Sequence, residues 1–157
     1  MKRVLIYIGI LALLFAAPVE RSDVGMLRPV QVVSVYSENG WVVLETDTED
    51  KGYGMSALEA LQNLKETSNG IIYLDTAQYL LITADTVGAV EELRQYLKPG
   101  VRLCMAVKQL PLKEVSRFFG VHGRLPRLKG WSEGEKLPVL GTFENSLTFL
   151  KKVEKSA

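Results

Sequence analysis

The side chains that most often bind metals or act as nucleophiles are scarce in this chain, which has one histidine, His122, and one cysteine, Cys104. A zinc site needs several Cys, His or carboxylate ligands at defined spacings, and neither a His pair nor a Cys–His set can form here. The Gly-x-Ser-x-Gly motif of serine hydrolases does not occur either. We therefore expect no catalytic residue, no metal, no cofactor and no enzymatic activity.

Both residues have ordinary structural interpretations. His122 lies between Gly120 and Gly123, a setting typical of an exposed loop. Cys104 lies in an apolar run, residues 101–107, that is typical of a buried strand. Without a second cysteine or a cluster of positive charge to activate its thiol, Cys104 is expected to be a small buried hydrophobe.

A run of acidic residues could suggest calcium binding, but it lacks the central Gly and terminal Glu of a calcium loop. Its carboxylates largely alternate along the chain, as they do on the solvent side of a hairpin, and Lys51 lies directly after them. We interpret this run as a solvated surface. It comprises Glu45, Asp47, Glu49 and Asp50.

The segment Gly52-Tyr53-Gly54 precedes a predicted helix and could form a phosphate-binding turn, because helix amino termini bind anions. It lacks a third glycine and a Lys-Ser/Thr pair, and Glu59 would repel an anion from the first helical turn. We predict a loop that leads into a capped helix.

One stretch has a local excess of positive charge interleaved with an aromatic residue. Such a stretch could contact an acidic partner or anionic lipid headgroups, although a solvated loop is the simpler interpretation. The candidate interaction patch consists of Arg117, Arg124, Arg127, Lys129 and Trp131. Over the whole chain 19 Lys and Arg face 18 Asp and Glu, so net charge does not favour a nucleic-acid partner.

The amino-terminal segment resembles a secretory signal. Lys2 and Arg3 precede an apolar stretch, residues 4–17, which is shorter than the roughly 20 residues that span a bilayer comfortably. The sequence therefore predicts that residues 1–17 are a signal peptide or short membrane anchor and that residues 18–28 are a polar linker. The rest of the chain is expected outside the membrane.

Cleavage of that segment stays open. Ala16 and Ala17 resemble a cleavage region, but the bulky Leu14 and Phe15 precede them and Pro18 follows directly. A retained anchor and a released domain are both compatible with the sequence. No cysteine follows the apolar stretch, so we expect no lipid-modified amino terminus.

Residues 29–120 predict an α/β (α+β) domain with a single mixed sheet. Asn39-Gly40 joins two β-branched runs and favours a type I′ hairpin. Ser56 and Glu59 form a capping box for a helix, and Pro99-Gly100 ends a second one. The predicted order is β-β-α-β-α-β-α, with the helices packed on the sheet.

The carboxy-terminal part, residues 121–157, is predicted to be a loop followed by a helix over residues 142–155. Phe143, Leu147 and Leu150 have the spacing of one helical face. We expect this part to lie outside the α/β domain.

The segment 54–82, GMSALEALQNLKETSNGIIYLDTAQYLLI, resembles the amino-terminal domain of the spore-germination receptor lipoproteins, the Ger(x)C family. A glycine-rich approach, an Ala-Leu-x-x-Leu helix and two short strands follow in the family's order. The resemblance extends over about residues 29–120. It implies a non-enzymatic subunit of a membrane-bound assembly in endospore-forming bacteria.

The chain departs from that family at Thr76, which replaces a strand histidine, and in lacking both the lipid-bearing cysteine and a large second domain. These departures indicate a stand-alone relative. We therefore expect an exported or membrane-tethered, non-catalytic domain that contacts envelope proteins in sporulation or germination. The alternatives are a self-assembling, ring-building scaffold module and a binder of small ligands.

Overall fold

The computed structural model describes residues 27–122, 125–132, 134–144 and 146–150. They form a mixed α/β fold around a seven-stranded sheet with the strand order β4-β3-β2-β6-β7-β8-β9. The four strands β2, β6, β7 and β8 run parallel, while β3, β4 and β9 are antiparallel to their neighbours. The predicted fold class is confirmed.

The predicted hairpin is the pair β2 (Val32–Glu38) and β3 (Trp41–Thr46). Asn39 and Gly40 both have positive φ, 52° and 82°, which a type I′ turn requires. The turn fixes the register in which Glu38 lies opposite Trp41.

The predicted loop before the first helix is partly wrong, because residues Lys51–Gly54 form strand β4 at the edge of the sheet. Gly52 and Gly54 lie where the strand meets helix α2 (Ala57–Thr67). A Cβ on Gly52 would collide with the backbone of Ala60 and Leu64, and one on Gly54 with the backbone of Glu59 and Ala60. The glycines therefore allow close strand–helix packing and do not form an anion-binding turn.

Helix α2 begins as predicted. The Ser56 side chain accepts a hydrogen bond from the Glu59 N–H at 3.2 Å. The Glu59 carboxylate accepts one from the N–H of Met55 at 2.8 Å, which is one residue before the cap. Leu61 and Leu64 are buried, whereas Leu58 is 36% exposed.

A separate two-stranded parallel sheet joins β1 (Leu27–Pro29) to β5 (Ile71–Tyr73). A single turn of 3-10 helix, η2 (Leu74–Thr76), follows β5. The hydroxyl of Thr76 accepts a hydrogen bond from the Val30 N–H at 2.9 Å and so fastens the start of the domain to this turn.

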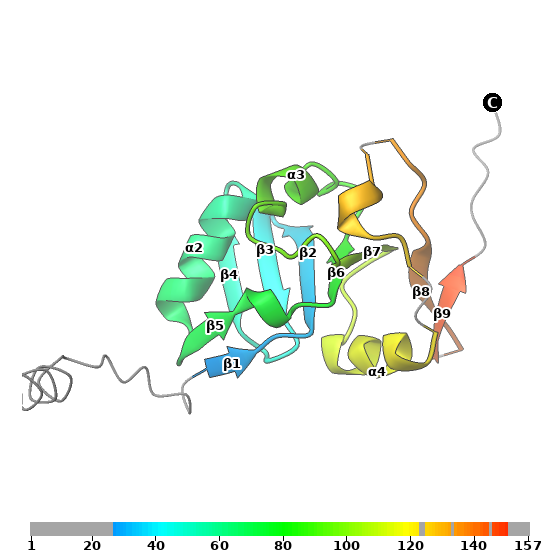
Figure 1. Ribbon diagram of the computed structural model, residues 1–157, viewed down its shortest axis with the longest axis horizontal. Helices are drawn as coiled ribbons and strands as arrows, with labels where there is room; N and C mark the ends of the chain where they lie inside the picture. The colour runs from blue at the N-terminus through cyan, green and yellow to red at the C-terminus, as the bar shows by residue number, and fades with distance from the viewer. Residues whose placement is uncertain (1–26, 123–124, 133, 145, 151–157) are drawn as a thin grey trace, which may run out of the picture.

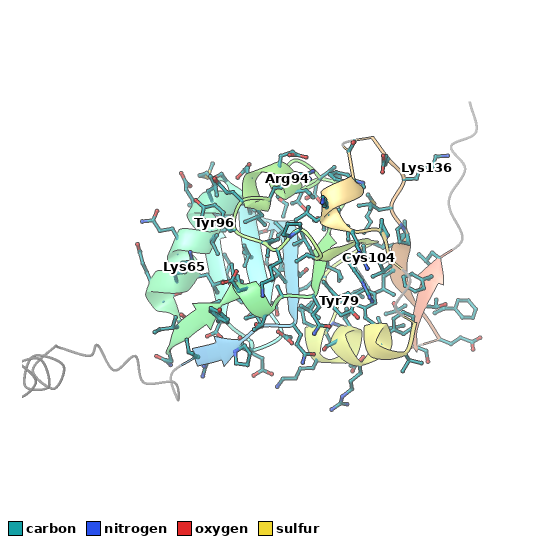
Figure 2. All side chains as sticks on the ribbon, in the orientation of Figure 1. Lys65, Tyr79, Arg94, Tyr96, Cys104 and Lys136 are labelled. Atoms are coloured by element: carbon teal, nitrogen blue, oxygen red, sulfur yellow. The ribbon has the colours of Figure 1, made fainter. Side chains whose placement is uncertain are left out.

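Strand β7 (Arg102–Ala106) lies in the apolar run 101–107, as predicted, and β6 (Tyr79–Ile82) is the second of the two short strands expected in the segment 54–82. Between them lies the short helix α3 (Ala89–Leu93), which buries Val90 and Leu93. Its neighbour Arg94 lies at the carboxyl end of α3 (Figure 2). The Arg94 guanidinium donates to the carbonyls of Leu128 at 2.8 Å and Trp131 at 3.1 Å.

Helix α4 (Leu112–His122) covers the face of the sheet opposite to the one that α2 and α3 cover (Figure 1). It runs through Gly120 to His122, so the loop predicted around His122 is wrong. Phe119 stacks on Tyr79 with ring centroids 4.6 Å apart, and Phe118 meets Phe149 edge-on at 5.3 Å.

The predicted carboxy-terminal helix is wrong. A 3-10 turn, η3 (Leu128–Gly130), leads to the hairpin β8 (Val139–Phe143) and β9 (Ser146–Leu150). The spacing of Phe143, Leu147 and Leu150 fits a helix, but Leu147 and Phe149 also alternate as in a strand, and tertiary packing decides. The part after residue 120 therefore completes the sheet instead of lying outside the domain.

Two apolar layers result, one on each face. The first joins the sheet to α2, α3 and η3. The second joins it to α4, and Leu147 and Phe149 of β9 pack against this layer. Within the described residues no helix is long and apolar enough to cross a membrane. The predicted signal or anchor, residues 1–17, and the linker up to residue 26 lie outside the described residues.

Candidate functional site

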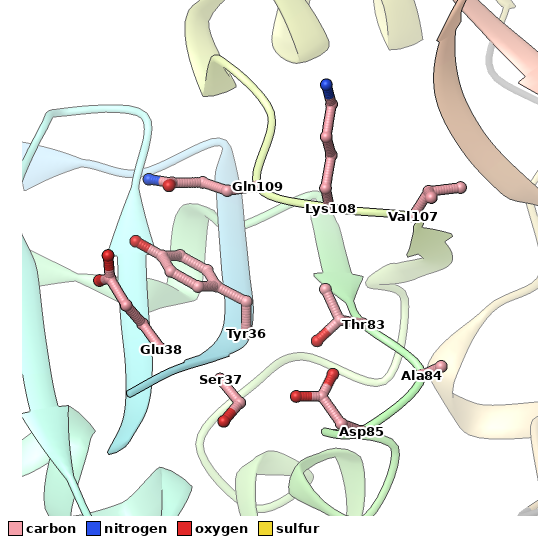
Figure 3. Close-up of a pocket in the computed structure, with 9 residues that line it drawn as sticks. All are labelled: Tyr36, Ser37, Glu38, Thr83, Ala84, Asp85, Val107, Lys108 and Gln109. Atoms are coloured by element: carbon pink, nitrogen blue, oxygen red, sulfur yellow. The ribbon is translucent and has the colours of Figure 1, made fainter. Parts of the chain in front are cut away.

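A pocket of about 390 Å³ opens where three adjacent parallel strands end (Figure 3). Each strand supplies three consecutive residues, and most of the nine are polar. Those that line it are Tyr36, Ser37 and Glu38 at the end of β2, Thr83, Ala84 and Asp85 after β6, and Val107, Lys108 and Gln109 after β7.

The topology of the sheet explains why a hollow forms there. From β2 the chain turns back to β3 on one side, whereas from β6 it continues through α3 to β7 on the other. The loops that leave β2 and β6 therefore diverge. Open α/β sheets bind ligands in crevices of this kind, outside the carboxyl ends of the strands.

A buried pair of threonines fixes the floor of the pocket. The Thr86 hydroxyl donates to the carbonyl of Val35 at 2.9 Å and accepts from the Thr83 N–H at 3.1 Å. The two threonine hydroxyls lie 3.1 Å apart. This network ties the loop after β6 to strand β2.

A second network forms one wall. The Tyr36 hydroxyl donates to the Glu45 carboxylate at 2.9 Å, and the Gln109 amide donates to the same carboxylate at 2.8 Å. Lys51 lies 3.3 Å from it. Burial is the main cause that raises the pKa of Tyr36 above its ordinary value, and the hydrogen bond to Glu45 is the second. The phenol therefore stays protonated at physiological pH.

Two carboxylates at the rim lack such partners. Among the described residues, neither the Glu38 carboxylate nor the Asp85 carboxylate makes a hydrogen bond or ion pair. Figure 3 shows the Lys108 side chain extending away from both. The rim therefore has unbalanced negative charge facing a pocket that a ligand can enter.

The predicted basic patch is not brought together. Arg117 lies on α4, whereas η3 packs on the opposite face of the sheet. The exposed Arg127 directly precedes η3, and the exposed Lys129 lies within it. Trp131 is only 4% exposed, because its ring packs in the first apolar layer and its indole N–H donates to the Glu135 carbonyl at 3.3 Å. Arg124 lies outside the described residues.

The acidic run interacts mainly with nearby donors. Asp47 accepts from the Gln31 N–H at 3.0 Å, and burial raises its pKa despite that bond. Glu49 pairs with Lys113 and Asp50 with Arg28. Across the described residues no group of three or more His, Cys, Asp or Glu is placed to hold a metal ion.

Cys104 is fully buried, as the sequence predicted. Burial raises the pKa of its thiol to about 12, and the thiol lies 3.2 Å from the Pro138 carbonyl. A thiol in this state is a poor nucleophile. His122 is the last residue of α4.

Sequence reasoning missed the pocket, although its residues carry a recognisable signal. Each of three apolar runs is followed directly by polar residues, at Ser37-Glu38, at Thr83-Ala84-Asp85 and at Lys108-Gln109. If the runs are adjacent parallel strands, these residues meet at one edge of the sheet. Comparison of the chain with protein-family models, curated proteins and solved structures finds no match.

Proposed function

We propose that this chain is a non-catalytic binding domain that takes up a small polar molecule in the pocket at the carboxyl ends of β2, β6 and β7. The observation that carries this proposal is the convergence of three strand ends on a pocket of about 390 Å³. That volume lies in the range of roughly 300–1,000 Å³ typical of small-molecule sites.

The sequence had favoured contact with envelope proteins. The residues expected to make that contact are divided between two faces, and the aromatic residue among them is buried. This separation shifts the balance toward the small-ligand alternative. Export or tethering of the domain, and a setting in sporulation or germination, stay predictions from the amino-terminal segment and the family resemblance.

The pocket proposal can be tested by filling the pocket. Ala84→Trp places a large ring at the exposed Ala84 in its lining, and Gln95→Trp adds the same ring at an exposed position elsewhere. Saturation-transfer NMR against sugars, amino acids, diamines, nucleotides and dicarboxylates should give ligands whose signal is lost in Ala84→Trp and kept in Gln95→Trp. If both variants bind every ligand as the wild type does, the pocket is not the binding site.

A second candidate function, self-association, is favoured by strand β9. This strand forms one edge of the sheet, and its five residues, Ser146–Leu150, include no charged residue and no proline. Unprotected edges of this type pair readily with other strands. Nearby Phe143 is 65% exposed. A second copy could therefore extend the sheet through β9.

Analytical ultracentrifugation tests this second candidate. Thr148→Lys places a charge in the middle of β9 and should abolish a concentration-dependent dimer, whereas Thr67→Lys on the exposed side of α2 should not. A wild-type chain that sediments as a monomer up to high micromolar concentration would rule out self-association through this edge.

A further inference from the structure

We infer that the strand-end pocket selects a small organic cation with a primary ammonium group; this inference rests on the proposed binding function and specifies its ligand. The reason is the direction of the hydrogen bonds. Around this pocket the hydroxyls of Tyr36 and Thr83 and one N–H of Gln109 are used within the protein, so these groups offer a ligand mainly acceptors. Among the described residues, the ammonium group of Lys108 is the free charged donor in the lining.

The threonine pair shows this most clearly. A hydroxyl has one proton, and that of Thr86 goes to the Val35 carbonyl at 2.9 Å. The Thr83 hydroxyl, 3.1 Å from that of Thr86, must then be the donor between the two. Thr83 lies on the pocket and is 8% exposed. Its oxygen can only accept a hydrogen bond from a ligand.

The wall opposite follows the same rule. Tyr36 gives its one proton to Glu45 at 2.9 Å, so its hydroxyl oxygen is left as an acceptor. Gln109 uses one N–H on the same carboxylate at 2.8 Å and retains its carbonyl oxygen and one N–H. Of the lining hydroxyls, that of the exposed Ser37 is left to act in either direction.

The charges at the rim of the pocket favour the same kind of ligand as the hydrogen bonds do. The carboxylates of Glu38 and Asp85 are acceptors only, and among the described residues no cation pairs with either. Lys108 is the cation in the lining, and its amine is directed away from them (Figure 3). Glu38 and Asp85 together outweigh Lys108, so the lining has a net charge of −1 that disfavours an anionic ligand.

An aromatic ring lies next to this acidic rim. Trp41 is directly opposite Glu38 in the β2–β3 register, so the two side chains share one face of the sheet. The Trp41 side chain is 49% exposed. Tryptophan is the best of the aromatic side chains at attracting a cation to its ring face.

These features favour a ligand that has both N–H donors and a positive charge over a ligand that has the charge alone. A primary ammonium group supplies three donors and a positive charge, which match the acceptor oxygens and the two carboxylates. A quaternary ammonium has the charge but no donor, and a dicarboxylate has neither. Two ammonium groups a few carbon atoms apart could engage both carboxylates.

Isothermal titration calorimetry with the full chain tests the inference using 1,4-diaminobutane, tetramethylammonium and glutarate as probes. We expect the diamine to bind more tightly than tetramethylammonium, and glutarate not to bind. Charge-assisted hydrogen bonds of this type are each worth about tenfold in affinity, so Glu38→Gln and Asp85→Asn should each weaken diamine binding by about that factor. Glu114→Gln, an exposed carboxylate on α4, is the matched control and should change nothing.

The outcomes separate this inference from the proposed function. Equal binding of the diamine and tetramethylammonium, or diamine binding that Glu38→Gln, Asp85→Asn and Glu114→Gln change alike, would overturn the assignment of an ammonium ligand to this pocket. Binding of glutarate, lost in Ala84→Trp, would overturn the ligand class but support the pocket. No binding of the diamine overturns the inference, and the proposed function then depends on the pocket-filling test alone.

Discussion

The two edges of the main sheet, β4 and β9, differ in what happens to their outward-facing backbone groups. At β4 the N–H of Tyr53 donates to the Asn63 side chain at 3.0 Å, and just beyond the strand the N–H of Met55 donates to Glu59 at 2.8 Å. Both acceptors belong to helix α2. The helix that packs on the end of the sheet therefore also blocks its edge.

No such arrangement is present among the described residues at β9, where Ser146–Leu150 ends the sheet. Helix α4 contacts this strand through aromatic rings on its face and leaves its edge alone. At the β4 edge one helix both buries a sheet face and protects the edge, because it approaches the strand closely. Gly52 and Gly54 provide that approach at β4.

The largest effect on stability is expected from Gly52→Val, which disrupts the packing of β4 against α2. The added side chain would collide with the backbone of α2 at Ala60 and Leu64, so helix and strand must separate. We expect a loss of about 4 kcal/mol or more in the free energy of unfolding, measured by urea denaturation. Gly120→Ala in α4 has open space for its Cβ and should be neutral or stabilise the chain. A stable Gly52→Val chain would contradict the close-packing explanation.

The next effect is on the β9 side. Phe119→Ala removes a ring that is 1% exposed and that stacks on Tyr79 and Phe149. Truncations of this kind cost about 3–5 kcal/mol in unfolding free energy. Denaturant titration of Phe119→Ala and of Phe143→Ala, whose ring is 65% exposed, should show a large and a small loss respectively. Equal losses would mean that the rings are not what holds β9.

The pH dependence of stability reports on the middle of the sheet. Burial raises the pKa of the Cys104 thiol to about 12, so the unfolded chain loses this proton at a lower pH than the folded one. Stability should therefore be full below about pH 8.5 and should fall by about 1 kcal/mol per pH unit above pH 9. Cys104→Ala should reduce that slope in denaturation curves at pH 8 to 10.5. The slope that remains includes Tyr36, whose pKa is raised as well.

The smallest effect concerns the protection of β4. Asn63→Ala removes the acceptor for the Tyr53 N–H and should cost about 1 kcal/mol. More informative is the second readout, because an opened β4 edge should begin to associate in light scattering. Gln62→Ala, one position earlier on the exposed side of α2, is the control. Unchanged association in Asn63→Ala would show that the side-chain cap does not protect the edge.

Sequence reasoning found the elements that short-range chemistry specifies. Asn39-Gly40 admits positive φ at both positions, and Ser56 with Glu59 satisfies the first helical N–H groups. These signals are local, so no tertiary information was needed to read them. The same holds for the apolar runs that became β6 and β7.

The errors arose where long-range packing decides. Gly52-Tyr53-Gly54 looked like a loop because glycine disfavours strands, yet α2 makes glycine necessary there. The residues after 142 match both the helical and the strand period. They form a strand because β9 pairs with β8, which in turn pairs with β7. Trp131, read as a surface contact, is buried through contacts with distant parts of the chain. The pocket needs the neighbour relations of three strands, which a single sequence does not specify.

Strand β1 has a mechanical consequence. Tension on the segment before residue 27 would enter the domain at this three-residue strand, which is held by its pairing with β5 and by the ion pair of Arg28 with Asp50. Three residues can release about 10 Å of chain before the load reaches β2 in the centre of the sheet. After β1 detaches, the hydrogen bond from the Val30 N–H to the Thr76 hydroxyl would be the next contact to break before the load reaches β2. The β1–β5 pair would thus separate first under tension and lengthen the chain before strain reaches the pocket.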